Sequence, residues 1–125
     1  MRKLIVCNFI TIDGLYDGVD GNMASLFAHQ HADYARDDSF DFYNAELLRT
    51  AGLLLLSGNA FLGNKAYWTS LPSDPDASAI RREYAALIAA VPKLVISDNL
   101  TPAELAPWDN TTITHARTPI ARSPR

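Results

Sequence analysis

Histidine and cysteine are the side chains in this 125-residue chain that most readily bind metal ions or act as nucleophiles. His29 and His31 offer two imidazoles, but no third ligand stands at a defined spacing from them, so the sequence predicts solvated loop histidines and no metal site. Cys7 is flanked by apolar residues rather than by cations, which disfavours its thiolate and predicts a small core residue. The chemistry is therefore expected at other residues.

Two aspartates stand beside predicted elements, and a family resemblance described below implies catalytic roles for both. Asp13 precedes Gly14 directly after the first apolar run, and Asp41 opens a segment with helical spacing. A carboxylate buried in a cleft has its pKa raised towards neutrality and can then donate a proton. Asp-Gly is also a common turn pair, and an acidic residue in the first turn of a helix suits the helix dipole. From the residues alone, both interpretations stay open.

The elements that must position these residues alternate between strands and helices. Short apolar runs predict strands over residues 4–10, 53–57, 93–97 and 110–114. The first two runs lack polar alternation, which predicts buried strands, the first of them central and covered on both faces. Helical spacing predicts a helix over residues 41–50 and a longer one that Asp74 or Ser78 caps and that runs to Pro92. Residues 59–66 are expected to form a short helix or a turn.

This alternation predicts an α/β domain with a mainly parallel central sheet, because strands separated by helices are joined by right-handed parallel crossovers. Ligands of such sheets collect at the carboxyl ends of the strands. The loops after Ile10, Ser57 and Ser97 all leave from that edge.

Composition excludes several classes of partner. The net charge of −3, with basic residues scattered among acidic ones, predicts no nucleic-acid partner. A single cysteine fits a reducing cytoplasm. The longest apolar run, residues 51–56, is far shorter than the roughly 20 residues that a membrane-spanning helix needs, so we expect a soluble protein.

Several short motifs occur together in a familiar order. They are Asp13-Gly14 after the first strand, Ser57-Gly58 after the second, the Tyr67-Trp68 pair, and Trp108 to Thr112. In this order and spacing, residues 2–112 resemble the dihydrofolate-reductase-like family, in particular the reductase domain of bacterial riboflavin-biosynthesis deaminase/reductase proteins. The resemblance implies a three-layer fold over residues 1–114, and an NADPH-dependent reductase that transfers hydride to a pteridine- or pyrimidine-like small molecule.

The resemblance also implies roles for single residues. Asp13 and Gly14 match the loop that closes near the nicotinamide, and Asp41 lies near the position of the acid that protonates or anchors the heterocycle. The remaining matches would bind the cofactor, at a helix N-terminus that resembles a phosphate cradle and in the loop after the third strand. These residues are Gly58, Asn59, Phe61, Ser97 and Asp98.

Two of these positions depart from the family motif. Asn59 stands where the family has arginine and Phe61 where it has threonine. The changes remove a cation and a hydroxyl, and with them charge-assisted hydrogen bonds of roughly 1.5–3 kcal/mol each. A second class therefore stays open, a truncated, non-catalytic relic or small-ligand-binding module.

The family continues after the fourth strand with a glycine-rich turn and an antiparallel hairpin, which this sequence does not show. Residues 115–125 instead hold three Arg and two Pro and few apolar side chains, so we expect a disordered or aberrant tail after a shortened domain. An incomplete sheet exposes an edge strand, and the sequence therefore predicts a homodimer.

Overall fold

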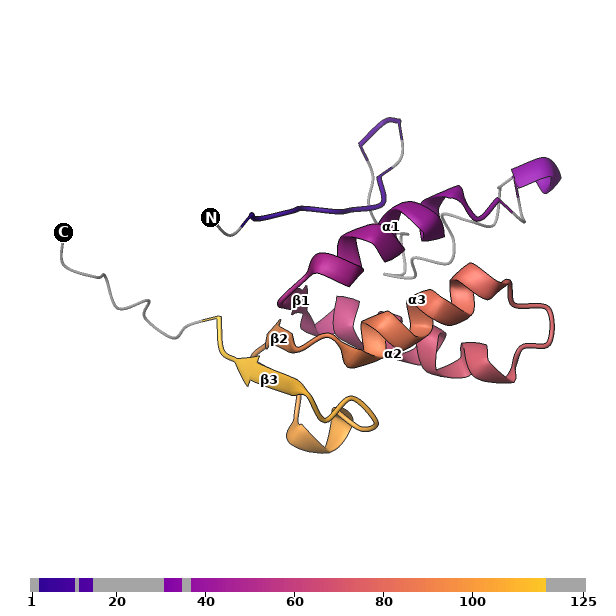
Figure 1. Ribbon diagram of the computed structural model, residues 1–125. Coiled ribbons are helices and arrows are strands. Elements are labelled where there is room, and N and C mark those ends of the chain that lie inside the picture. Colours follow the sequence, from indigo (N-terminus) through magenta and orange to yellow (C-terminus); the bar gives the residue numbers. More distant parts are fainter. Residues whose placement is uncertain (1–2, 11, 15–30, 35–36, 117–125) are drawn as a thin grey trace. The chain divides into compact units, whose positions relative to one another are not determined.

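A computed structural model describes residues 3–10, 12–14, 31–34 and 37–116 of the chain (Figure 1). These residues belong to two compact units, Met1–Asp37 and Asp38–Arg125. The described part of the first unit contains a turn that ends at Gly14, whose φ is +88°, and the short 3-10 helix η2 (Ala32–Tyr34). Residues 117–125, most of the expected tail, lie outside the described residues.

Residues 3–10 form no strand, and their side chains are exposed. Leu4 is 88% exposed and Val6 75%, so the prediction of a central strand buried on both faces is wrong for this segment. Cys7 is exposed as well, which corrects the prediction of a core cysteine. Apolar and β-branched residues suit a strand, but the strand forms only where a sheet provides a partner for it.

The second unit contains a three-stranded parallel sheet. Its strands are β1 (Leu54–Ser57), β2 (Lys93–Ile96) and β3 (Thr111–Thr114), in the order β1-β2-β3. Leu54 lies beside Lys93, and Lys93 lies beside Thr111. The predicted α/β class with a mainly parallel sheet is therefore confirmed, with each strand inside its predicted range.

The second unit also contains three α-helices, one before β1 and two between β1 and β2 (Figure 1). They are α1 (Ser39–Thr50), α2 (Gly58–Ser70) and α3 (Ala79–Ala90). The Ser57 hydroxyl accepts a hydrogen bond from the N–H of Ala60 at 3.3 Å and so caps α2. Ser78 caps α3 in the same way, as predicted, and α3 stops before Pro92 because the residue preceding a proline avoids helical backbone angles. None of the helices in the described residues is long and apolar enough to cross a bilayer.

The core lies between the helices and one face of the sheet. Its most deeply buried side chains come from α2, α3 and β2, namely Phe61, Ile88 and Val95. Leu54 and Leu56 pack against this core, whereas Leu55 between them is 53% exposed. The prediction of a fully buried strand over 53–57 is therefore wrong, because an all-apolar run does not show which face a neighbour will cover.

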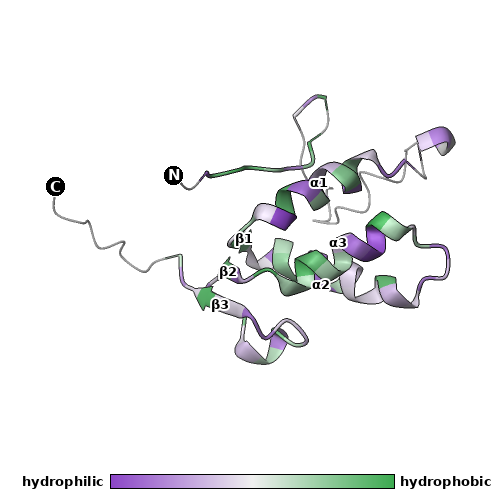
Figure 2. Cartoon of the chain, in the orientation of Figure 1, coloured by the Kyte–Doolittle hydropathy of each residue, from purple (hydrophilic) through white to green (hydrophobic). Residues whose placement is uncertain are grey.

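Helix α3 has charged side chains on its exposed face and apolar side chains on the face that packs in the core. Figure 2 shows hydrophilic and hydrophobic residues together along this helix. Ile80 and Ile88 are buried, while Arg82 and Glu83 are exposed. This distribution is the amphipathic pattern expected of a helix that covers one side of a sheet.

Candidate functional site

A cavity of about 110 Å³ opens where β1 and β2 end and α2 begins, which we call the edge cavity. The loop after β2 forms its other wall and contains the 3-10 helix η4 (Pro102–Glu104). Ligands of parallel sheets collect at this edge, where strands end and the first turn of a helix leaves N–H groups without intrahelical partners. The lining residues are Gly58, Asn59, Leu62, Ser97, Asn99, Leu100 and Glu104.

Gly58 lets α2 approach the end of β2 closely. A Cβ atom at this position would lie 2.6 Å from the Ser97 hydroxyl oxygen, well inside contact distance. The same oxygen accepts hydrogen bonds from the N–H groups of Asn99 at 3.3 Å and Leu100 at 3.1 Å. The contact between Gly58 and Ser97 therefore brings the first turn of α2 beside the loop after β2, and the cavity lies between these two segments.

Glu104 is the acidic residue of the cavity lining. Its Oε2 accepts hydrogen bonds from the N–H of Thr101 at 2.8 Å and from the Thr101 hydroxyl at 2.7 Å. These bonds lower the pKa of Glu104, first through the Thr101 hydroxyl and then through the backbone N–H, so Glu104 is ionised at neutral pH. Lys65 donates to the backbone carbonyl oxygens of Glu104 and Ala106, not to the carboxylate. Among the described residues, the cavity lining includes no lysine or arginine.

Of the six predicted cofactor residues, counting Gly14 of the first unit, three line the edge cavity, namely Gly58, Asn59 and Ser97. Asp98 points elsewhere, because its Oδ1 accepts a hydrogen bond from the N–H of Ala116 at 3.2 Å. Phe61 is fully buried and packs edge-to-face on Trp108 with ring centroids 5.7 Å apart. This burial corrects the expectation that Phe61 contacts a cofactor, since no part of its ring reaches the cavity.

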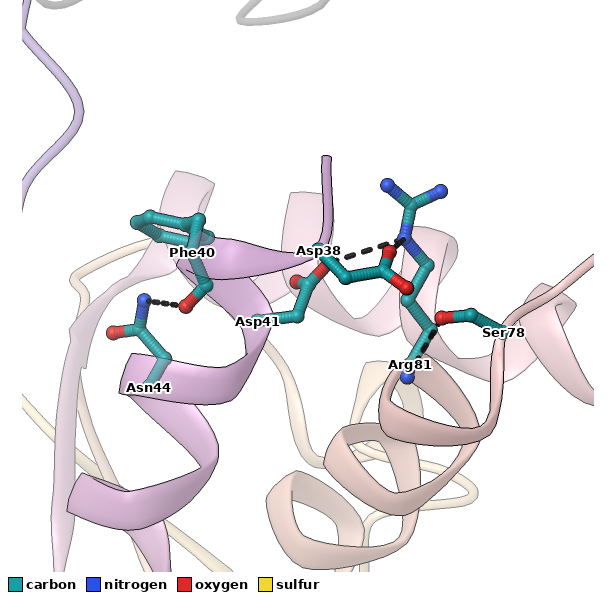
Figure 3. Close-up of polar contacts among 6 residues, drawn as sticks. All are labelled: Asp38, Phe40, Asp41, Asn44, Ser78 and Arg81. Atoms are coloured by element: carbon teal, nitrogen blue, oxygen red, sulfur yellow. Dashed lines mark hydrogen bonds and ion pairs between the residues drawn. The ribbon is translucent and has the colours of Figure 1, made fainter. Parts of the chain in front are cut away.

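Asp41 joins α1 to α3 (Figure 3). Its Oδ2 accepts a hydrogen bond from Nε of Arg81 at 3.0 Å, and Asp38 Oδ1 lies 3.2 Å from the same nitrogen. Burial raises the pKa of Asp41, the Arg81 hydrogen bond and charge oppose that shift, and the charge of Asp38 adds to it. Asp41 does not line the edge cavity, so its position in α1 fits a helix-pairing role.

The remaining predicted residues belong to the first unit or to the core. Asp13 and Gly14 form a turn, as the Asp-Gly pair predicts, and their role near a cofactor stays a prediction. His29 lies outside the described residues, and His31 is exposed. Within the described ranges, no group of three His, Cys, Asp or Glu side chains could hold a metal ion. Trp68 belongs to the core cluster, while Tyr67 beside it is 50% exposed.

Sequence reasoning missed the residues of η4 and its cap. Thr101 and Glu104 are three positions apart, which is the spacing of a capping box, and Pro102 stands at the first helical position. This pattern would have indicated a short helix in the loop after β2, with the Glu104 side chain bonded back to Thr101. Asn99 follows Ser97 and Asp98 in the loop that the family resemblance indicates, whereas Leu62 had no comparable signal.

Comparison with known proteins adds no relative. No family model, no curated protein and no solved structure matches this chain. The resemblance to the dihydrofolate-reductase-like family therefore depends on the sequence motifs described above.

Proposed function

We propose that the chain is a dinucleotide-binding domain of the reductase type that its sequence resembles, and that the edge cavity receives a ribose of the cofactor. The observation that carries the proposal is the carboxylate of Glu104 beside the N-terminus of α2, at the ends of two adjacent parallel strands. In dinucleotide-binding folds an acidic side chain at this edge accepts hydrogen bonds from ribose hydroxyls. Asn59 and Asn99 add amide donors and acceptors to the same cavity.

The lining fits NADH and does not fit the extra phosphate of NADPH. A 2′-phosphate is normally bound by arginine, but Asn59 occupies that motif position and no cation lines the cavity. The ionised Glu104 carboxylate would repel the phosphate. The nicotinamide cofactor supplies a hydride when bound, and the resemblance implies a pteridine- or pyrimidine-like acceptor.

Asp13 and Asp41 are the two candidates for a proton donor that the resemblance implies. Burial raises the pKa of Asp41, but Arg81 holds its carboxylate in an ion pair between two helices. Gly14, which follows Asp13, has a φ of +88°.

The second candidate function is binding without catalysis. The edge cavity of about 110 Å³ has room for a single ribose-sized group rather than for a whole dinucleotide. Phe61 is buried in the core, and Asp41 binds Arg81 between two helices. Neither residue is needed for a module that only binds a small ligand in the edge cavity.

We also propose that the chain forms a homodimer through β1. In the described residues β1 pairs with β2 alone, and the N–H of Leu54 donates to the carbonyl of Pro92 at the β2 side. By strand alternation, the N–H of Leu55 points to the outer edge. No charged residue occurs between Thr50 and Gly58 to prevent pairing with a second β1.

Calorimetric titration of the full chain with NADH and NADPH tests the cofactor proposal. We expect NADH to bind more tightly, and Asn59→Arg to raise NADPH affinity about tenfold through a charge-assisted hydrogen bond. Ala66→Arg adds the same charge to an exposed position of α2 that does not line the cavity, and should leave the preference unchanged.

Each alternative outcome is informative. Tighter binding of NADPH by the unmodified chain would contradict the proposal, as would equal effects of the two arginine substitutions. Binding of adenosine without either dinucleotide would favour the binding module. Saturable NADH binding followed by NADH oxidation with a pteridine acceptor would support the reductase.

A further inference from the structure

A second and larger hollow lies between α2, α3 and the loop at residues 106–108. Its volume of about 520 Å³ falls in the range of roughly 300–1,000 Å³ that is typical of small-molecule sites. Trp68, Pro107 and Trp108 form its walls, and the small side chains of Ala85, Ala86 and Ala89 on α3 leave the space open. We call this hollow the tryptophan groove.

The two tryptophan rings are held in place by contacts inside the fold. Nε1 of Trp68 donates a hydrogen bond to Oδ1 of Asn64 at 3.1 Å, and its ring packs on that of Tyr84 with centroids 4.3 Å apart. Trp108 packs edge-to-face on Phe61, and Nζ of Lys93 lies 4.5 Å from its ring centroid. Both residues are less than one-tenth exposed, so each presents only a small part of its surface to the groove. A planar ligand would therefore meet a largely preformed apolar wall.

Arg82 is the charged residue of the groove lining. Its Nη2 donates hydrogen bonds to the backbone carbonyl oxygens of Asp74 at 2.7 Å and Pro75 at 3.4 Å. The ion pairs found across residues 37–116 include Arg49 and Arg81 but not Arg82. The guanidinium is thus oriented by neutral carbonyls while its charge is not offset by a carboxylate, which suits an anionic ligand group.

We propose that the tryptophan groove binds a small planar aromatic carboxylate. The aromatic ring lies against Trp68, Trp108 and the alanines of α3, and the carboxylate accepts hydrogen bonds from Arg82. None of these residues lines the edge cavity, so this proposal is independent of the proposed cofactor site.

Nuclear magnetic resonance of the ¹⁵N-labelled full chain tests this proposal with 2-naphthoate as the probe. The chain has two tryptophans and both line the groove, so the two indole N–H signals report on this site. We expect 2-naphthoate to shift both signals saturably, and its neutral analogue 2-naphthylmethanol to bind at least tenfold more weakly. Equal affinity for the two probes, or no saturable shift with 2-naphthoate, would overturn the proposal.

Three variants locate the binding. Arg82→Gln should lower 2-naphthoate affinity about tenfold, to that of the neutral analogue. Arg49→Gln removes the same charge from an ion pair with Glu83 and should have no effect. Ala86→Leu fills the groove from an exposed position of α3 and should abolish binding of both probes while the unliganded indole signals remain dispersed. Unchanged affinity in Arg82→Gln or in Ala86→Leu would refute the assignment.

Discussion

Gly58 is the residue at which α2 and the end of β2 come closest. A Cβ atom there would lie 2.6 Å from Oγ and 3.0 Å from Cβ of Ser97. We expect Gly58→Ala to lower the free energy of unfolding by about 1–3 kcal/mol, because the new methyl group must displace Ser97. Gly63→Ala is the matched control in the same helix, where nothing lies within 4 Å, and should instead be stabilising by up to about 1 kcal/mol. Urea denaturation measures both; a stabilised Gly58→Ala variant would contradict the close approach.

Lys93 is a buried ammonium group with three oxygen acceptors. Nζ donates hydrogen bonds to the carbonyl oxygens of Ala89 at 3.2 Å and Val91 at 2.9 Å, and to Oδ1 of Asn110 at 3.2 Å. Burial nevertheless lowers the pKa of Lys93 from 10.5 to about 8. Because the unfolded chain then binds this proton more tightly than the folded chain, stability should rise as the pH increases from about 8 towards 10.5, by up to roughly 3 kcal/mol.

Urea denaturation at about pH 8 and 10 measures this rise, within the window set by the two pKa values. Lys93→Met removes the titrating group and should flatten the pH dependence. Lys65→Met, which removes a lysine that is not fully buried, should preserve it. The same slope in all three proteins would show that Lys93 is not responsible.

At the scale of elements, Arg81 couples the first turns of α1 and α3. Its Nε binds Asp41 and Asp38, and the side chains of the arginine and of Asp41 are 29% and 10% exposed (Figure 3). We expect Arg81→Gln to destabilise the fold by about 2 kcal/mol at pH 7, because two neighbouring carboxylates lose their shared cation.

The loss should be smaller near pH 4. Burial raises the pKa of Asp41, and loss of Arg81 removes two contributions that lower it, so the cost of the unpaired charge disappears as the pH falls through the folded-state pKa. Arg49→Gln disrupts a more exposed pair with Glu83 and should cost less than about 1 kcal/mol at either pH. Thermal unfolding at both pH values distinguishes the two variants; an Arg81→Gln defect that grows at low pH would contradict the assignment.

At the scale of the whole molecule, the outer edge of β1 is where a second copy would add. Leu55 is 53% exposed on this strand. Leu55→Lys should shift the protein towards monomer in sedimentation velocity, because a charge on an edge strand opposes edge-to-edge pairing. Tyr43→Lys places the same charge on an exposed residue of α1 and should leave the dimer unchanged. A monomer in the unmodified chain at micromolar concentration would exclude the proposed dimer.

The sequence by itself determined the α/β class, the helices and three of the strands. Ser78 and Pro92 mark the ends of α3 through local backbone chemistry, which needs no tertiary partner. The loops after Ser57 and Ser97 leave from one edge of the sheet, as predicted, because parallel strands joined by helices bring their carboxyl ends together.

Tertiary structure alone decided which apolar segments are covered. Residues 4–10 and 53–57 have similar compositions, yet the first forms no strand and the second is half buried. Tertiary structure also placed Glu104 in the lining of the edge cavity and brought Asp41 beside Arg81. Hydrophobic periodicity and capping act within a few residues of the chain, whereas burial and charge pairing depend on which distant elements pack together.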